Sequence, residues 1–189
     1  RCVAELGRRT PATHEAELLR RLAHPHVIAC HGYFWDNGRG CLYALLDYAA
    51  GGDLAGVIQG RTVGGHSYFL PETWVWLALE QICAGLAHLH AAGVVHRDIK
   101  TLNILVAPRG PTVVAEPHVP RGLPPLPFDP GLKLADLGVS RQVTERTHLL
   151  WTAYGTPLYV SPEICEGRAY DATTDIWSLG VVLYELCAL

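Results

Sequence analysis

Apolar residues recur at helical spacing in three stretches of this chain. Thr10 and Pro11 predict the start of a helix that continues to about Leu22. A longer helix is predicted before Ala92-Gly93, and a third from about Ile176. The three apolar stripes are, in chain order, Leu18, Leu19 and Leu22; Val75, Leu79, Ile82, Leu86 and Leu89; and Leu179, Val182, Leu183 and Leu186.

Four shorter apolar runs predict strands. Residues 27–34 and 41–48 flank Asp36-Asn37-Gly38 and predict a hairpin. Residues 104–106 and 132–134 predict two short strands that bring Asn103 and Asp136 together. The segment between them, residues 107–130, is rich in proline and predicts an insertion that forms a mobile surface loop.

Composition limits the classes of protein to consider. With 189 residues, 49% of them hydrophobic, the chain can bury a substantial core. Its net charge of −3 predicts no nucleic-acid partner and no anionic membrane partner. No apolar run has the length of a membrane span. The six cysteines show no C-x-x-C spacing, so reduced thiols in the cytoplasm are expected rather than disulfides or a zinc site.

Residues 96–103 place an acid, two cations and an amide within one short loop. Asp98 can accept or orient the proton of an attacking hydroxyl, and Lys100 can lie against phosphoryl oxygens. Asn103 offers a neutral oxygen to a cation. Phosphoryl transfer needs a group for each of these tasks, and a solvated turn after a helix does not.

This loop resembles the catalytic loop of the eukaryotic protein kinases, and further motifs follow in that family's order. Asp136-Leu137-Gly138 resembles the metal-binding triplet, and Ser161-Pro162-Glu163 resembles the end of the activation segment. Residues 175–180 resemble the start of the central buried helix. The resemblance implies a truncated α+β, two-lobe fold. Residues 1–48 would form a partial β-rich N-lobe with helix C, and residues 49–189 a mainly helical partial C-lobe ending at the central helix.

The same resemblance implies roles for the catalytic residues, with ATP and Mg²⁺, or Mn²⁺ in its place, as cofactors. Asp98 would be the catalytic base and Lys100 the phosphate clamp. Asn103 and Asp136 would bind the metal. Thr156 would bridge Asp98 and Lys100.

Further residues would bind the nucleotide or hold the active form. Glu15 would pair with a lysine of the third strand, although its place beside the apolar stripe also allows it to lie in water. Residues Leu46, Asp47, Tyr48 and Ala49 would form the gatekeeper and hinge, or else a plain strand end. Asp53 is predicted to cap the next helix and to contact a ribose or peptide. Leu105 would be the floor of the adenine site, and Leu19, His96 and Leu137 would stack in a hydrophobic spine.

Residues 155–166 resemble the NimA-related (NEK) kinases, and Lys100 resembles serine/threonine kinases. The resemblance implies protein substrates with Ser or Thr acceptors and a cytoplasmic location, with cytoskeletal or ciliary partners at the level of the family. Arg97 implies activation by phosphorylation, with phosphorylated Thr152 as its anion. An unmodified surface threonine is the alternative at position 152.

The chain departs from the kinase pattern at its N-terminal end. Its two lysines are Lys100 and Lys133, so none precedes Glu15, and no G-x-G-x-x-G precedes the first helix. We expect a fragment with little activity, cut from a longer chain. Residues 2–6 also resemble the end of a third strand without its lysine. The two hypotheses are therefore an ATP-dependent serine/threonine kinase and a pseudokinase-like binding module without turnover.

Overall fold

The computed structural model describes residues 2–7, 10–110, 122–137, 141–142 and 157–188, with the backbone alone for residues 2–7, 10–15 and 141–142. Its helices are α1 (Thr10–Arg21), α2 (Leu54–Gly60), α3 (Glu72–Ala91), α4 (Pro162–Cys165) and α5 (Thr173–Cys187), with 3₁₀ turns at Thr101–Asn103 and Pro157–Tyr159. Its strands are β1 (Cys2–Gly7), β2 (Cys30–Asp36), β3 (Cys41–Leu46), β4 (Thr62–Val63), β5 (His66–Ser67), β6 (Val94–Val95), β7 (Ile104–Val106), β8 (Leu132–Leu134) and β9 (Arg141–Gln142).

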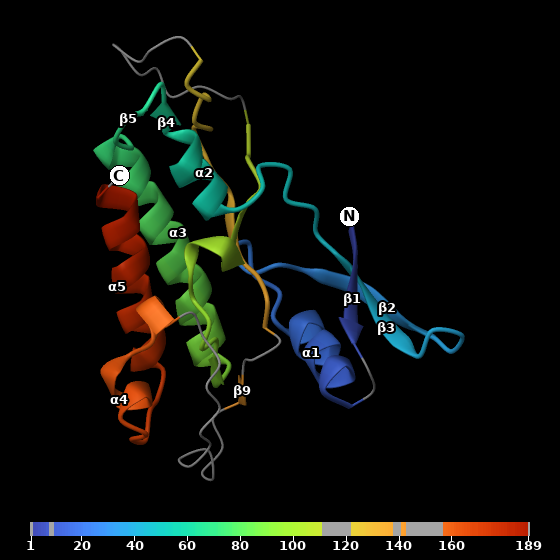
Figure 1. The fold of residues 1–189 in the computed structure, drawn as a ribbon. Coiled ribbons are helices and arrows are strands. Elements are labelled where there is room, and N and C mark those ends of the chain that lie inside the picture. The colour runs from blue at the N-terminus through green and yellow to red at the C-terminus, as the bar shows by residue number, and fades with distance from the viewer. Residues whose placement is uncertain (1, 8–9, 111–121, 138–140, 143–156, 189) are drawn as a thin grey trace.

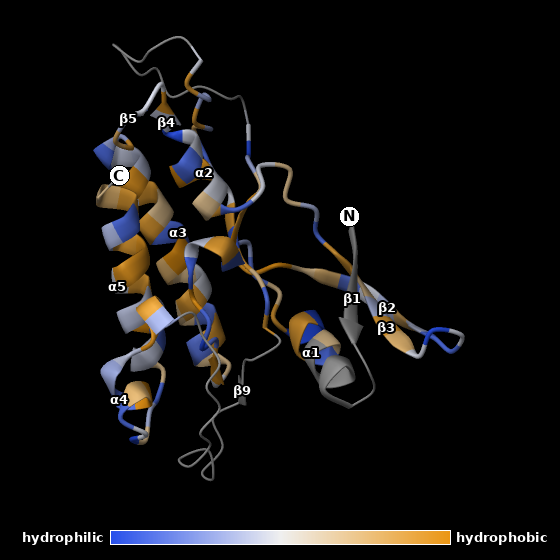
Figure 2. Cartoon of the chain, viewed as in Figure 1, coloured by the Kyte–Doolittle hydropathy of each residue, from blue (hydrophilic) through white to orange (hydrophobic). Residues whose placement is uncertain are grey.

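A three-stranded antiparallel sheet with one helix forms the N-terminal part. The strand order is β1-β3-β2, and α1 packs against β2 and β3 (Figure 1). The β2–β3 hairpin confirms the prediction from residues 27–48. Its turn is hydrophilic (Figure 2), and the Asp36 carboxylate accepts hydrogen bonds from the backbone of Gly38 and Arg39 at 2.8 and 3.2 Å. Ala16 of α1 packs on Leu42 of β3, so one face of the sheet is covered by the helix.

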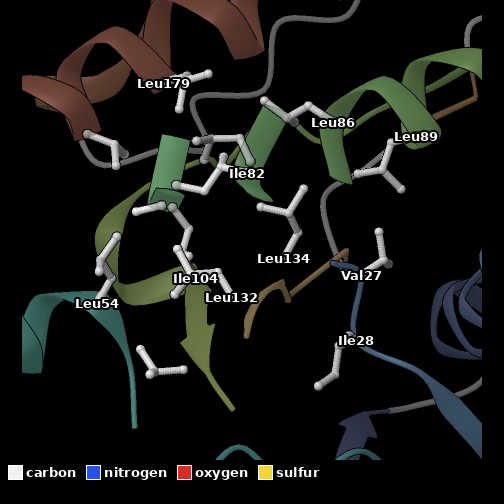
Figure 3. Packing of buried hydrophobic residues seen from close by; sticks show 14 of the residues in the cluster. Val27, Ile28, Leu54, Ile82, Leu86, Leu89, Ile104, Leu132, Leu134 and Leu179 are labelled. Atoms are coloured by element: carbon white, nitrogen blue, oxygen red, sulfur yellow. The ribbon is translucent and has the colours of Figure 1, made fainter. Parts of the chain in front are cut away.

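The C-terminal part is mainly helical. α3 lies beside α5, and the β7–β8 pair packs against α3 on another side (Figure 1). The predicted stripe of α3 is buried at Val75, Ile82, Leu86 and Leu89 and half-buried at Leu79. Figure 3 shows Ile82, Leu86 and Leu134 converging with Val27 of the segment after α1. One hydrophobic core therefore joins α3, α5, the short strands and the N-terminal part.

The second half of the proline-rich segment corrects one prediction. Residues 122–130 pack on α3 instead of forming a mobile surface loop, because they bury an apolar side chain and satisfy polar groups of that helix. Leu126 is buried, and the Trp74 indole donates to the Pro127 carbonyl oxygen at 3.1 Å. The Gln81 amide donates to Asp129 at 2.8 Å and its oxygen accepts from the Leu132 backbone at 2.7 Å. Residues 111–121 lie outside the described part.

Within the described residues, no helix combines the length and apolar character needed to cross a membrane.

Candidate active site

A buried carboxylate fixes the backbone of the catalytic loop. Asp175, at the start of α5, is fully buried. Its oxygens accept from the backbone N–H groups of His96 and Arg97 at 2.9 and 2.8 Å, and one of them lies 2.8 Å from His90 Nε2. Arg97 has φ of 69°, a left-handed conformation that a non-glycine residue adopts only when its surroundings enforce it. Asp175 therefore holds the loop in a conformation that it would not adopt alone.

The Asp98 carboxylate lies at the centre of the loop. Lys100 Nζ is 2.6 Å from Asp98 Oδ2, and Asn103 Nδ2 donates to the same oxygen at 2.8 Å. Asn103 Nδ2 also donates to the Asp98 backbone oxygen at 2.8 Å. These bonds orient the acid and place a cation beside it, which is the arrangement that positions a hydroxyl and stabilises phosphoryl charge.

Asp136 is brought to the same loop by the β7–β8 pair. Ile104 pairs with Leu134, and the Ala135 N–H donates to the Asn103 carbonyl oxygen at 2.9 Å. Asp136 itself has φ of 63°, so its backbone is also held in the left-handed region. The prediction that the two short strands bring Asn103 and Asp136 together is confirmed.

His96 is a buried imidazole ring whose pKa is influenced by several carboxylates. Burial lowers the pKa of its imidazole, while Asp175, the Ala135 carbonyl oxygen, Asp98 and Asp136 act in the opposite direction. Burial outweighs the carboxylates, so His96 is neutral and its Nε2 donates to the Ala135 carbonyl oxygen at 3.0 Å. The ring also accepts from the Asp98 N–H at 3.3 Å, so it is bonded on one side to the backbone of Asp98 and on the other to that of Ala135, the residue before Asp136.

The residues at this end of the site fit a magnesium ion. Both N–H groups of the Asn103 amide are used by Asp98, which leaves the amide oxygen as the group available to a cation. Asp136 adds a carboxylate. No cluster of three or more His, Cys, Asp or Glu side chains suited to a metal occurs in the described residues. An Asn–Asp pair suits Mg²⁺, which binds to one or two carboxylates and completes its shell with phosphate oxygens and water.

The predicted hinge residues have different surroundings. The Asp47 carboxylate is 3.1 Å from Lys133 Nζ and 2.7 Å from His31 Nε2. The backbone N–H of Asp47 donates to the Ala29 carbonyl oxygen at 3.0 Å. Leu46 packs on the main core, whereas Tyr48 is largely exposed and Ala49 is half-buried. The Asp47 side chain is therefore engaged by protein groups, and a nucleotide would meet the hinge through its backbone.

Asp53 and Leu105 lie opposite each other. They form an isolated antiparallel bridge, and Leu105 is half-buried beside the main core. The Asp53 carboxylate caps α2 by accepting from the Gly56 N–H at 2.8 Å, which confirms the predicted cap. The contact with a ribose or peptide stays a prediction.

The register of β1 shows which of its positions lie on the face of the sheet that α1 covers. Cys2 pairs with Leu46, Ala4 with Ala44 and Glu5 with Tyr43. Opposed residues of an antiparallel pair share a face of the sheet, and Leu42, on the same face as Ala44, packs on α1. Ala4, like Cys2, is therefore a β1 position on the face of the sheet that α1 covers. The strand expected at residues 2–6 is present, and it carries no lysine.

Several predicted residues are placed only in part. Glu15 belongs to α1, but its side chain lies outside the described part of the structure, as do Thr152, Thr156 and Gly138. Leu19, His96 and Leu137 are all buried, and Leu19 and Leu137 belong to one cluster, against which Cys30 also packs. The Arg97 guanidinium donates to the Tyr170 hydroxyl at 2.9 Å.

The sequence did not indicate that Asp175 takes part in the site. It is an acid at the start of an apolar helix, and such a residue is buried only when several donors surround it. His90, near the end of α3, lies within hydrogen-bonding distance of it. The sequence does not show this contact, because the two residues are far apart in the chain.

Comparison with known proteins identifies the class. The family model described as "Protein kinase domain" matches residues 4–188, and the chain therefore belongs to the protein kinase family.

Within the family, the chain is similar to NEK-type serine/threonine kinases. It is 39% identical to mouse serine/threonine-protein kinase Nek5 over 93% of this chain and 24% of that protein. It is 35% identical to the probable serine/threonine-protein kinase nek3 of Dictyostelium discoideum over 96% of this chain and 14% of that protein. Rat serine/threonine-protein kinase ULK3 is 34% identical over 90% of this chain and 30% of its own length. The chain thus spans less than a third of each of these relatives.

Proposed function

We propose that this chain transfers the γ-phosphoryl group of ATP to serine or threonine hydroxyls of proteins. The observation that carries the proposal is the Asp98 carboxylate, held at once by Lys100 Nζ at 2.6 Å and Asn103 Nδ2 at 2.8 Å. The similarity to serine/threonine kinases over nearly the whole chain supports the substrate class.

In this proposal each residue has one task. Asp98 orients the acceptor hydroxyl and takes its proton, while Lys100 lies against the phosphoryl oxygens. Asn103 and Asp136 would hold Mg²⁺, which would neutralise phosphate charge. Asp175 keeps the loop in place through the His96 and Arg97 N–H groups. Thr156 bridges Asp98 and Lys100, and Leu105 lines the adenine site.

One observation favours a second candidate, a binding module with weak or no turnover. β1 carries no lysine for the α- and β-phosphates and Glu15, and Ala4 stands on the face of the sheet that α1 covers. Such a chain would keep the residues that bind the metal but would lack the lysine that binds the α- and β-phosphates of the nucleotide. The two candidates differ in whether the chain as it stands transfers phosphate.

A lysine placed at position 4 separates the candidates. Nucleotide affinity and transfer from ATP to a Ser/Thr peptide library are measured for the 189-residue chain, Asp98→Asn, Ala4→Lys and the control Glu5→Lys, which places a lysine on the opposite face. A charge-assisted hydrogen bond contributes about 1.5–3 kcal/mol, so Ala4→Lys should tighten nucleotide binding by roughly tenfold to a hundredfold.

Each result has a distinct meaning. Transfer by the unmodified chain that falls by about a hundredfold or more in Asp98→Asn supports the kinase. Nucleotide binding without transfer in the unmodified chain, and transfer gained only in Ala4→Lys, supports the binding module. If Asp98→Asn transfers phosphate as fast as the unmodified chain, the assigned base is wrong. If Glu5→Lys improves affinity as much as Ala4→Lys, the register argument fails.

We further propose that phosphorylated Thr152 activates the site by pairing with Arg97. The support is the half-buried cation of Arg97 next to Asp98 in the loop, whose charge an added phosphate would offset. Thr152→Ala should lower transfer after treatment with an activating kinase, and Thr173→Ala, an exposed threonine at the start of α5, should not. Equal activity of Thr152→Ala and the unmodified chain would contradict the switch.

A further inference from the structure

The segment that connects α1 to β2, residues 22–29, is docked tightly on the helical part. The Leu134 N–H donates to the His26 carbonyl oxygen at 3.0 Å, and the Ile28 N–H donates to the Leu134 carbonyl oxygen at 2.9 Å. Gly85 of α3 passes so close that a Cβ there would lie 2.6 Å from the His26 carbonyl oxygen. This 22–29 segment is therefore the place where α1 is fastened to α3 and β8.

Three imidazole rings gather at this contact. His24 stacks on His88 of α3, with ring centroids 4.8 Å apart and planes 17° apart. The His26 ring is tilted against His24 at 5.6 Å. Two of the rings come from the 22–29 segment and one from α3, so the stack spans the joint.

The hydrogen bond that His24 accepts requires the neutral form of its ring. His24 Nδ1 accepts from the His26 N–H at 3.1 Å, so a proton on that nitrogen would replace an attraction with a clash. His26 Nδ1 lies 2.8 Å from the Leu132 carbonyl oxygen and must be the donor there. His88 Nε2 is buried without a hydrogen-bond partner among the described residues, so a charged ring would bury an unpaired N–H.

The charged groups around the stack are mostly cationic. Lys133 Nζ and Arg109 Nη2 each donate to the Pro25 carbonyl oxygen at 3.0 Å. Asp47 is the acid bonded to Lys133, and it is also bonded to His31. Burial lowers the pKa of His24, and His88, His26 and Lys133 lower it further. A proton gained by the stack would thus be added to positive charge.

We propose that the His24–His88 stack is an acid-sensitive joint: protonation of His24 separates the two rings and loosens the 22–29 segment, and with it α1, from α3 and β8. The joint would make the coupling between the sheet and the helical part depend on pH in the mildly acidic range. This is independent of phosphoryl transfer and is measured without a substrate.

The sign follows from the direction of the pKa shift. The folded-state pKa of His24 lies below its ordinary value of 6.5, so the unfolded chain binds the proton more readily. The contribution to stability is fully present above pH 6.5 and is lost as the pH falls from there toward the folded-state pKa. Buried His96, whose pKa is also lowered, adds its own slope in the same range.

The test compares unfolding by urea, and amide exchange of residues 22–29, at about pH 7.5 and about pH 5.5. The unmodified chain is compared with His24→Phe, which keeps a stacked ring that cannot titrate, and with His24→Asn, whose amide oxygen can still accept from the His26 N–H. His66→Gln, at an exposed histidine of β5, is the control. Removing one titrating ring should reduce the acid-induced change in the unfolding equilibrium constant by up to about tenfold.

The expected result is a flatter pH dependence in His24→Phe and His24→Asn, with the protection factors of the His26 and Ile28 amides, taken relative to intrinsic exchange at each pH, no longer lowered by acid. The His66→Gln control should keep the slope of the unmodified chain. The proposal is overturned if either folded variant keeps the full slope, or if His66→Gln flattens it equally. If His24→Phe does not fold, His24→Asn alone decides between these outcomes. If neither folds, a protection factor of the His26 amide in the unmodified chain that is the same at both pH values would overturn the proposal.

Discussion

Gly85 is the residue at which α3 passes closest to the N-terminal part. A Cβ at this position would lie 2.6 Å from the His26 carbonyl oxygen and 3.0 Å from Leu134 Cδ1. Backbone oxygen cannot yield as a flexible side-chain end can, so the two elements would have to move apart. The residue is therefore required for close packing rather than for backbone freedom.

We predict that Gly85→Ala destabilises the chain and that Gly180→Ala does not. Alanine stabilises a helix relative to glycine by about 1 kcal/mol. At residue 85 the displacement of α3 from the His26 backbone should cost roughly 1–3 kcal/mol, which outweighs that gain. Gly180 lies in α5, where a Cβ would have nothing within 4 Å, so it should show the helix gain alone. Urea unfolding measures both. A Gly85→Ala chain as stable as Gly180→Ala would contradict the close contact.

Residue identities at the site were largely readable from the sequence, because the chemistry is concentrated in one short loop. Asp98, Lys100 and Asn103 were predicted from their spacing, and the structure brings them within hydrogen-bonding distance. The role of Ala4 was not readable, since it depends on the register of β1 against β3. Asp175 was predicted only as the start of a helix, because its donors lie almost eighty positions earlier in the chain.

At the scale of elements, helices were predicted better than the segments between them. The stripe from Val75 to Leu89 predicted α3, and Thr10-Pro11 predicted the start of α1. Residues 122–130 were predicted to be mobile from their prolines, yet Leu126 is buried and Trp74 and Gln81 bond to this segment. Proline excludes a regular helix or central strand, but it does not prevent an extended chain from packing against a helix.

At the scale of the whole molecule, Lys133 joins the N-terminal sheet, the 22–29 segment and β8. Its Nζ is 3.1 Å from Asp47 Oδ2 and donates to the Pro25 carbonyl oxygen at 3.0 Å. Burial raises the pKa of Asp47, but hydrogen bonds with His31, Lys133 and the Ala29 N–H outweigh it and lower the pKa below 3.8. The stability from Asp47 is therefore present above pH 3.8 and is lost as the pH falls through the folded-state pKa.

We predict that Lys133→Gln moves acid unfolding to higher pH, because the pKa of Asp47 then returns toward its ordinary value. Arg39→Gln removes a cation from an exposed pair with Asp36, in which Arg39 Nε is 4.0 Å from the carboxylate, and should change acid unfolding little. Circular dichroism during acid titration measures both midpoints. Coinciding midpoints for Lys133→Gln and the unmodified chain would show that Asp47 is not held by this lysine.

The sequence by itself determined α1, α3, α5, the β2–β3 hairpin and the β7–β8 pair, and which residue types the catalytic loop contains, because periodicity and local spacing are properties of neighbouring residues. Tertiary structure alone decided what distant residues do together. It placed Ala4 opposite Ala44, buried Asp175 beneath the catalytic loop, packed residues 122–130 on α3 and stacked His24 on His88. Each of these depends on strand register or on how helices approach one another, and such contacts are set by packing of the whole core.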